Sequence, residues 1–413
     1  MKQNLSFIFV HGLSGWGSYD KQYRYMPYWG MRGGDLMQFL NGLGYACFAA
    51  SVAPKGSAWD RACELYAQLA GTRTDYGAVH SRKYGHARFG RDFSDKPLLP
   101  AWGPETRLVL LGHSFGGVTV RLFSELLANG DADEKAGQMP DGLNINMEEI
   151  SPLFLGGMGD RIHSIITLAA PTNGTTAYDL FQDPSFHPER IRVPWWSRAL
   201  AAMMSRGVRP RSDGRDERDF AAHDMQIDHA LALNKRIATL PHVYYFAVPC
   251  SFTEKQADGT HRPKRGIEPL FVMRSSQIGA YTGKSAGGIV FDETWQENDG
   301  LVNTVSAGAP MGEPSKQLSI DLSECGKKIR GKKVSSSNEE KPEKKASSSR
   351  EAMSGMKETA SGQNIPEREP ILPGIWNVFP PCDGDHMYPQ GGLVRKHDIR
   401  GFYQELLDLV AAL

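Results

Sequence analysis

The sequence has no excess of charge of either sign, because its 413 residues include 47 lysines and arginines and 47 aspartates and glutamates. A protein without a basic field has no electrostatic means of attracting nucleic acid or an acidic membrane. The sequence also lacks an apolar run long enough to span a bilayer. We therefore expect neither a nucleic-acid partner nor a transmembrane segment.

Cysteine is scarce, and its five occurrences show no paired spacing: Cys47, Cys63, Cys250, Cys325 and Cys382. An odd number of scattered cysteines in a chain of this size argues against a disulfide framework. No secretory leader is recognisable either, because residues 7–10 already have the character of a core strand. The protein either remains inside the cell or has lost its leader in this sequence.

The sequence is organised around a serine at residue 114. Residues 107–111 form an apolar run, Gly-His-Ser-Phe-Gly follows at 112–116, and residues 118–127 have a helical pattern. This is the nucleophile-elbow pattern, in which a tight turn between a strand and a helix exposes the serine hydroxyl. Glycines flank the serine because the turn is crowded. The alternative is an ordinary turn between a strand and a helix.

Alternating apolar strands and amphipathic helices predict an α/β protein with a mostly parallel central sheet flanked by helices. Expected strands cover residues 5–10, 45–52, 107–112, 162–169, 243–248 and 374–379. Expected helices cover residues 31–43, 58–69, 118–127, 225–240 and 394–413.

Two segments depart from this alternation inside one catalytic domain, residues 1–413. Residues 175–222 include Trp195 and Trp196 ahead of a short methionine-rich helix, and they predict a lid over an apolar cleft. The alternative is a helix that simply packs on the core. Residues 325–368 are rich in serine, lysine and glutamate, which predicts a disordered insertion.

A serine nucleophile needs a histidine to take its proton and a carboxylate to orient that histidine. In the α/β-hydrolase order the acid and then the histidine follow the serine. His386 lies in a loop between the last expected strand and the last helix, whereas His397 is expected inside that helix. Asp299 is the preferred acid over Asp292. Two further acids, Asp383 and Asp385, lie too near His386 in sequence to be good orienters but remain open.

The oxyanion that forms during acyl transfer needs two backbone N–H donors. The amide of Phe115, directly after the nucleophile, is the first expected donor. The glycine-rich loop at residues 11–17 would bring the amide of Leu13 to the same edge of the sheet.

Two histidines, His80 and His86, lie in a stretch rich in glycine and aromatic residues that we expect to be a loop. Imidazole is a common zinc ligand, and Asp60 on the preceding helix is able to join them. Because the spacing fits no short metal motif, ordinary hydrogen-bonded histidines are the alternative.

The sequence resembles the thermostable bacillus-type true lipases, which are relatives of the staphylococcal lipases. The resemblance is carried by Val-His-Gly at 10–12, Gly-Trp-Gly at 15–17, Tyr-Trp-Gly at 28–30, Trp-Asp-Arg-Ala-Cys-Glu at 59–64, residues 75–90, the serine elbow, Ser-Pro-Leu-Phe at 151–154, Asn-Asp-Gly-Leu-Val-Asn at 298–303, and Asp-His at 385–386. It runs from near the N-terminus to the last helix. Residues 59–90 are its most specific part.

The resemblance implies an α/β-hydrolase fold and a triad of Ser114, Asp299 and His386. It implies an oxyanion hole at Leu13 and Phe115, although the family usually has glutamine at position 115. The implied activity is hydrolysis of triacylglycerols at a lipid–water interface. A carboxylesterase for shorter soluble esters and a non-catalytic binding protein are the alternatives. The family is secreted, and the sequence leaves both the compartment and the oligomeric state open.

The resemblance also implies a structural zinc ion held by two aspartates and two histidines. Asp60, His80 and His86 match three of these ligands. Asp224 is the best match to the fourth, and Asp219 or Asp228 are the alternatives. The family often binds calcium through an acid two residues after the catalytic histidine. That position is Tyr388 here, so we expect this calcium site to be absent or changed.

Overall fold

A computed structural model describes residues 5–137, 149–200, 214–322 and 370–413. Its centre is a sheet of seven strands in the order β13-β14-β7-β6-β5-β1-β2. All six neighbouring pairs in this sheet are parallel. The strands are β1 (Leu5–Val10), β2 (Ala46–Ala50), β5 (Arg107–His113), β6 (Ile162–Leu168), β7 (Tyr244–Val248), β13 (Ser315–Gln317) and β14 (Trp376–Val378). The predicted α/β class and parallel sheet are therefore confirmed.

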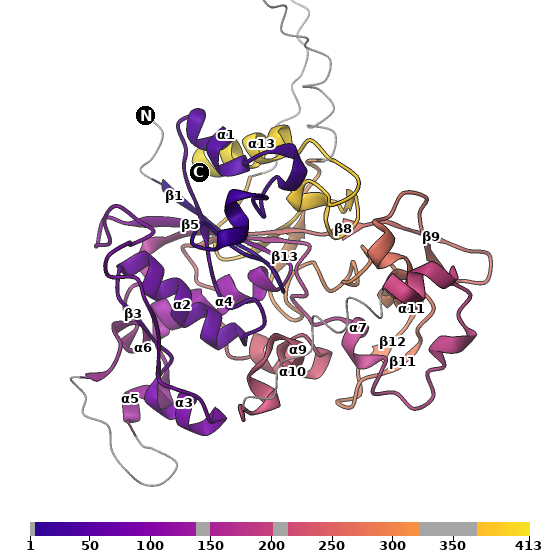
Figure 1. Ribbon diagram of the computed structural model, residues 1–413, viewed down its shortest axis with the longest axis horizontal. Coiled ribbons are helices and arrows are strands. Elements are labelled where there is room, and N and C mark those ends of the chain that lie inside the picture. Colours follow the sequence, from indigo (N-terminus) through magenta and orange to yellow (C-terminus); the bar gives the residue numbers. More distant parts are fainter. Residues whose placement is uncertain (1–4, 138–148, 201–213, 323–369) are drawn as a thin grey trace, which may run out of the picture.

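Helices cover both faces of the sheet (Figure 1). Helices α1 (Leu36–Gly42) and α13 (Arg400–Ala411) lie on one face, where Leu40 and Leu406 contribute to one apolar core. Helices α2 (Ala58–Ala70), α4 (Phe115–Asn129) and α6 (Pro152–Leu155) lie on the other face, in a second core that includes Leu65 and Phe123. Burial on both faces explains why the central strands are continuous apolar runs rather than alternating ones.

The strand order reverses between β1 and β5, because β2 follows β1 on one side and β6 follows β5 on the other. In parallel sheets, binding sites form beyond the carboxyl ends of the strands at such a reversal. The loop after β1 and the serine after β5 both lie there, since β1 ends at Val10 and β5 at His113.

Several expected elements have different bounds in the structure. The helix expected at residues 31–43 is split into η2 (Met31–Gly33) and α1, because Gly34 has a φ of 104° and Asp35 caps the new helix through the N–H of Met37. The expected loop around His80 contains helix α3 (Ala78–Tyr84) between two paired strands, β3 (Arg73–Asp75) and β4 (Phe89–Asp92).

Two further expectations are corrected near the C-terminus. Helix α13 begins only at Arg400, so His397 precedes it instead of lying inside it. Strand β13, which pairs with β14 at the sheet edge, was not expected, because residues 315–317 are polar and exposed or half-buried.

The expected lid region, residues 175–222, contains α7 (Thr176–Asp179), η5 (Pro188–Arg190), helical residues 195–200, η6 (Glu217–Asp219) and the start of α9 (Ala221–Asp224). Residues 201–213, including the end of the expected methionine-rich helix, lie outside the described residues, and so does the expected disordered insertion at 325–368. Within the described parts of the chain, no helix combines the length and apolar character needed to cross a membrane.

Candidate active site and metal centre

Ser114 occupies a strained turn between β5 and α4. Its backbone has φ 55° and ψ −131°, a combination that L-residues with a side chain rarely adopt. The neighbouring glycines are required because the turn leaves no room for a side chain at their positions. A Cβ on Gly112 would lie 2.3 Å from the carbonyl oxygen of Gly116, and one on Gly116 would lie 2.2 Å from that of Val10. The sequence thus folds into the tight elbow that its glycines predict.

The structure brings Ser114, His386 and Asp299 together from three remote parts of the chain. His386 Nε2 lies 2.8 Å from Ser114 Oγ, and His386 Nδ1 lies 2.8 Å from Asp299 Oδ2. Asp299 is fixed in turn, because its Oδ1 accepts the N–H groups of Leu301 and Val302 at 3.0 and 2.8 Å. All three members of the set are buried. A hydroxyl, an imidazole and a carboxylate in this geometry can carry out acyl transfer.

The other acids that the sequence left open have different partners. Asp292 is exposed and caps η8 (Glu293–Trp295) through the N–H of Thr294. Asp383 is exposed and pairs with Lys264. Asp385 is buried, but its carboxylate accepts the backbone N–H groups of Glu268 and Met387.

The two expected oxyanion donors flank the serine. A Cβ on Gly12 would lie only 2.7 Å from that of Ser114, so the peptide between Gly12 and Leu13 runs directly beside the nucleophile. Phe115 is the first residue of α4, where backbone N–H groups have no partner within the helix. Among the described residues, no acceptor is recorded for the amide of either Leu13 or Phe115. Both amides are therefore available to a bound oxygen.

A buried histidine under the site links these loops. His113 Nε2 lies 2.9 Å from the carbonyl oxygen of His386, so Nε2 carries the proton and donates. Nδ1 then accepts from the hydroxyl of Tyr28, which lies 2.7 Å away and itself accepts the N–H of Gly12. Burial, and next the nearby His386, hold the pKa of His113 well below its usual value. This histidine is therefore neutral, as the hydrogen bonds require.

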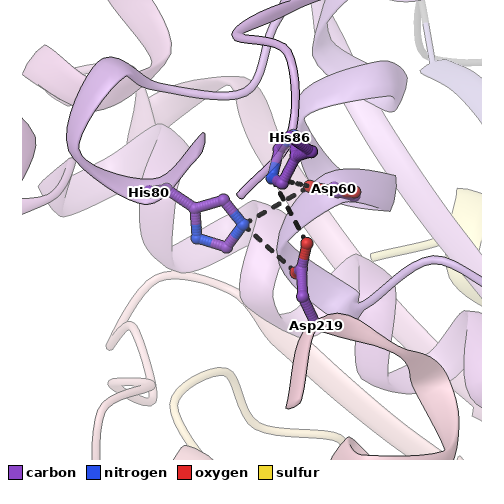
Figure 2. Close-up of side chains that lie close together, drawn as sticks. All are labelled: Asp60, His80, His86 and Asp219. Atoms are coloured by element: carbon purple, nitrogen blue, oxygen red, sulfur yellow. Dashed lines mark hydrogen bonds and ion pairs between the residues drawn. The ribbon is translucent and has the colours of Figure 1, made fainter. Parts of the chain in front are cut away.

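A second cluster of four side chains lies on the side of the sheet that α2 covers (Figure 2). It contains Asp60 from α2, His80 from α3, His86 just beyond α3 and Asp219 from η6, and one ligand atom of each lies within 4.8 Å of all the others. His80 Nε2 is 3.4 Å from Asp60 Oδ1 and 3.2 Å from Asp219 Oδ1, and His86 Nε2 is 3.2 Å from Asp219 Oδ2. A group of this composition and spacing can bind a metal ion.

The atoms of this cluster fit a cation in two further respects. Asp60 Oδ1, Asp219 Oδ2 and His86 Nε2 are buried and have no hydrogen-bond partner. His86 Nδ1 donates to the carbonyl oxygen of Ala87 at 2.9 Å, which leaves a lone pair on Nε2, facing the carboxylates. The lone pairs of these three atoms converge in a buried space, which is destabilising unless a cation fills it.

The charges of the cluster are strongly coupled. Burial by itself would raise the pKa of Asp219 and lower that of His80. The close contact between His80 and Asp219, together with the nearby charge of Asp60, outweighs burial, so the pKa of Asp219 lies far below its usual value and that of His80 lies above it. Arg215 adds a cation at the edge of the cluster, where its Nη1 is 2.7 Å from Asp60 Oδ2.

Asp224, the expected fourth ligand, does not belong to this cluster, and Asp219 takes the fourth position instead. Asp224 lies at the end of α9, and its Oδ2 instead accepts the N–H of Ala58 at 2.7 Å, at the first turn of α2. Asp219 comes one short turn earlier in the chain and points at both histidines. The sequence analysis gave Asp219 as an alternative fourth ligand, but nothing in the local sequence pattern favours it over Asp224.

Sequence reasoning gave no role to three buried or half-buried polar side chains that contact these sites: Tyr28, Arg61 and Arg215. Arg61 could have been singled out from the sequence alone, because Asp60 and Arg61 are two adjacent charged residues with apolar residues on both sides in the expected helix. A charged side chain on the buried face of a helix needs a specific partner.

Comparisons with known proteins agree with this fold. Residues 3–188 match the family described as "Lipase-like, C-terminal domain". Lipase 2 of Staphylococcus aureus is 32% identical over 334 residues, which are 76% of this chain and 46% of that protein. A lipase of Staphylococcus epidermidis is 30% identical over 332 residues, with the same shares. The chain thus spans about half the length of the curated relatives it matches.

Solved structures of two lipases are among those that resemble nearly the whole chain. Staphylococcus hyicus lipase has a TM-score of 0.71 at 26% identity and covers 98% of this chain and 95% of its own. Lipase 1 from Pelosinus fermentans has a TM-score of 0.66 at 26% identity and covers 100% of both chains. The chain is therefore a homologue of the staphylococcal lipases and has an α/β-hydrolase fold.

Proposed function

We propose that the chain is a triacylglycerol lipase that cleaves carboxylic esters by way of an acyl-enzyme on Ser114. The observation that carries the proposal is the continuous hydrogen-bonded series from Ser114 Oγ through His386 to Asp299. Homology to proteins named as lipases supports the choice of ester substrates.

In the proposed mechanism, Ser114 Oγ attacks the ester carbonyl while His386 Nε2 takes the hydroxyl proton. Asp299 keeps the proton of His386 on Nδ1 and stabilises the imidazolium that forms. The amides of Leu13 and Phe115 donate to the oxyanion. His386 then returns its proton to the leaving alcohol, and a water molecule activated by the same nitrogen releases the fatty acid and restores Ser114.

Hydrolysis rates on emulsified long-chain triacylglycerol and on soluble short-chain p-nitrophenyl esters test this function. A lipase is expected to accelerate when the ester exceeds its solubility limit, and Ser114→Ala is expected to abolish both activities. A rate that saturates below the solubility limit would assign the chain to the carboxylesterases. Full activity of Ser114→Ala on both substrates would remove the proposed mechanism.

We further propose that residues 175–222 act as the lid of this lipase. Trp195 and Trp196 are 80% and 40% exposed, although tryptophan is usually well buried. Replacing both with serine is expected to reduce the rate on emulsified ester while leaving the rate on soluble ester unchanged. Equal effects on both substrates would contradict the proposed lid.

We propose zinc as the metal of the second cluster, held by Asp60, His80, His86 and Asp219. Two imidazole nitrogens and two carboxylate oxygens are a donor set that zinc accepts, and four protein ligands complete a tetrahedral shell. Such an ion would be structural, and it would join α2 and α3 to η6, near the C-terminal end of the proposed lid region. Asp60 and Asp219 would supply the negative charge, and Nε2 of each histidine would supply a neutral ligand.

Elemental analysis of protein never exposed to chelator is expected to find about one zinc per chain. Asp219→Asn is expected to lose the metal. Asp224→Asn is the matched control, since it changes an aspartate five residues away that contacts Ala58 instead of the cluster, and it is expected to keep the metal. Loss of the metal in Asp224→Asn but not in Asp219→Asn would show that Asp224 is the ligand. Absence of zinc from the unmodified protein would contradict the proposed zinc site.

A further inference from the structure

The loop that carries Leu13 is fixed by hydrogen bonds along two consecutive peptide planes. In the first, the carbonyl oxygen of His11 accepts from Arg61 Nη2, and the N–H of Gly12 donates to the hydroxyl of Tyr28. In the second, the carbonyl oxygen of Gly12 lies 2.8 Å from His11 Nδ1, 3.2 Å from the N–H of Gly15 and 3.5 Å from Arg61 Nη1. Because C=O and N–H point in opposite directions in a trans peptide, holding the carbonyl of Gly12 aims the N–H of Leu13.

Arg61 also reaches the second proposed donor. Its Nε donates to Thr119 Oγ1 at 2.8 Å, and that hydroxyl donates in turn to the carbonyl oxygen of Phe115 at 3.0 Å. The guanidinium carbon lies 5.1 Å from the centre of the Phe115 ring. A single planar side chain on α2 therefore contacts the loop after β1 and the first turn of α4. These are the two segments that carry the proposed oxyanion donors.

Arg61 forms no salt bridge, although the charge of Glu64, one turn further along α2, acts on its guanidinium. The side chain is fully buried, and among the described residues no carboxylate lies within salt-bridge distance of it. Its acceptors are the carbonyl oxygens of the glycine-rich loop and of Ala53, with the hydroxyl of Thr119. Burial lowers the pKa of Arg61 to about 10, so the group remains protonated at neutral pH. A buried cation without a paired anion is costly, and negative charge that appears nearby during a reaction is stabilised by it.

We propose that Arg61 is the positioning residue of the oxyanion hole: its guanidinium holds the Gly12–Leu13 peptide and the start of α4 in register, and its charge favours the oxyanion over the uncharged ester. This role rests on the proposed ester hydrolysis at Ser114. Arg61 does not touch the substrate. It acts through the peptide of Leu13 and through Thr119.

A buried arginine with a purely structural role is the competing explanation, and the chain offers a matched control for it. Arg121 on α4 is also buried, has a pKa lowered by burial to about 10, donates to Asn234 and lies over the ring of Trp376. Unlike Arg61, it has no recorded contact with residues 11–15 in the described structure. Arg121→Met measures the effect of losing a buried cation elsewhere in the same core.

The experiment compares Arg61→Met, Arg61→Lys and Arg121→Met in the full chain, each shown to be folded by its near-ultraviolet circular dichroism. The substrates are soluble p-nitrophenyl esters. A trifluoromethyl ketone, which Ser114 converts into a tetrahedral oxyanion, measures stabilisation of that charge, and the matching secondary alcohol measures uncharged binding. Arg61→Met is expected to lower kcat and ketone affinity by the same factor, on the order of 10–100, with KM and alcohol affinity changed less than about threefold.

Arg61→Lys keeps the charge and is expected to recover part of the loss, whereas Arg121→Met is expected to keep the wild-type kcat. Equal losses in the two methionine variants, or a loss in Arg61→Met that alcohol binding shares with ketone binding, would overturn the proposal. If Arg61→Met does not fold, Thr119→Val takes its place, because it removes the partner of Nε at nearly constant volume. An unchanged kcat and ketone affinity in Thr119→Val would then also overturn it.

These outcomes are separable from a failure of the proposed function. Wild-type protein that shows no ester hydrolysis dependent on Ser114 would remove the function itself, whatever the arginine variants do. Wild-type hydrolysis together with full activity of Arg61→Met would remove only the role of Arg61.

Discussion

Replacing Ser114 by glycine is expected to stabilise the protein relative to replacing it by alanine. The serine backbone has φ 55° and ψ −131°, which glycine adopts freely and any residue with a Cβ does not. Backbone strain of this kind costs about 1–3 kcal/mol. Against this, the greater unfolded-state entropy of glycine costs about 0.5–1 kcal/mol relative to alanine, so the expected net difference in unfolding free energy is about 0–2.5 kcal/mol, with a central value of about 1 kcal/mol in favour of Ser114→Gly.

The comparison isolates the backbone, because both variants lose the same hydrogen bond to His386 and both are expected to be inactive. Unfolding entropies near 2.1 cal/mol/K per residue convert the difference into about 1–2 °C for a chain of this size. Calorimetry and denaturant titration of the two variants under identical metal conditions provide the measurement. If Ser114→Gly unfolds at the same temperature as Ser114→Ala or below it, the elbow does not store strain at this serine.

Three further predictions concern the residues around His386. Asp299→Asn is expected to lower kcat on the order of 10⁴-fold, whereas Asp385→Asn lowers it far less; a larger loss in the second variant would exchange their roles. Burial first, and then the charges of Glu268 and Asp299, raise the pKa of Asp385 to about 6. Below pH 3.8, the ordinary pKa of an aspartate, protonated Asp385 contributes its full stabilisation of the folded state, and this contribution is lost as the pH rises through 6. The difference in unfolding free energy between wild type and Asp385→Asn is therefore expected to shrink between about pH 4 and 7. Unfolding titrations in which that gap stays constant would contradict the shift. Because Tyr388 replaces the acid of the family's calcium site, millimolar calcium is expected to leave activity and melting temperature unchanged, and calorimetry with and without calcium tests this.

The sequence allowed prediction of the features that depend on short patterns. The elbow at Ser114 is local, since it needs only a strand, a crowded turn and a helix within about a dozen residues. The central strands were equally predictable, because burial on both faces leaves apolar runs such as Leu108–Leu111 of β5.

Features that depend on contacts between separate segments of the chain were harder to predict from the sequence. Asp219 and Asp224 are only five residues apart, and the turn between η6 and α9 decides which of them faces His80. The break in the helix expected at residues 31–43 depends on a left-handed backbone at Gly34. The role that we assign to Arg61 required the loop after β1 to be seen lying against α2, which no pattern within α2 encodes.

The parallel strand order has a consequence for how activity appears during folding. His386 follows β14, which takes its place between β7 and β13 and so joins the sheet next to a strand more than a hundred residues earlier in the chain. The contact between His386 and Ser114 spans 272 positions of sequence. Contacts of such long range are slow to form, so a nascent or refolding chain is expected to bring His386, the proposed proton acceptor, to Ser114 late in folding. Turnover of a chromogenic ester would therefore serve as a late and stringent reporter of complete refolding.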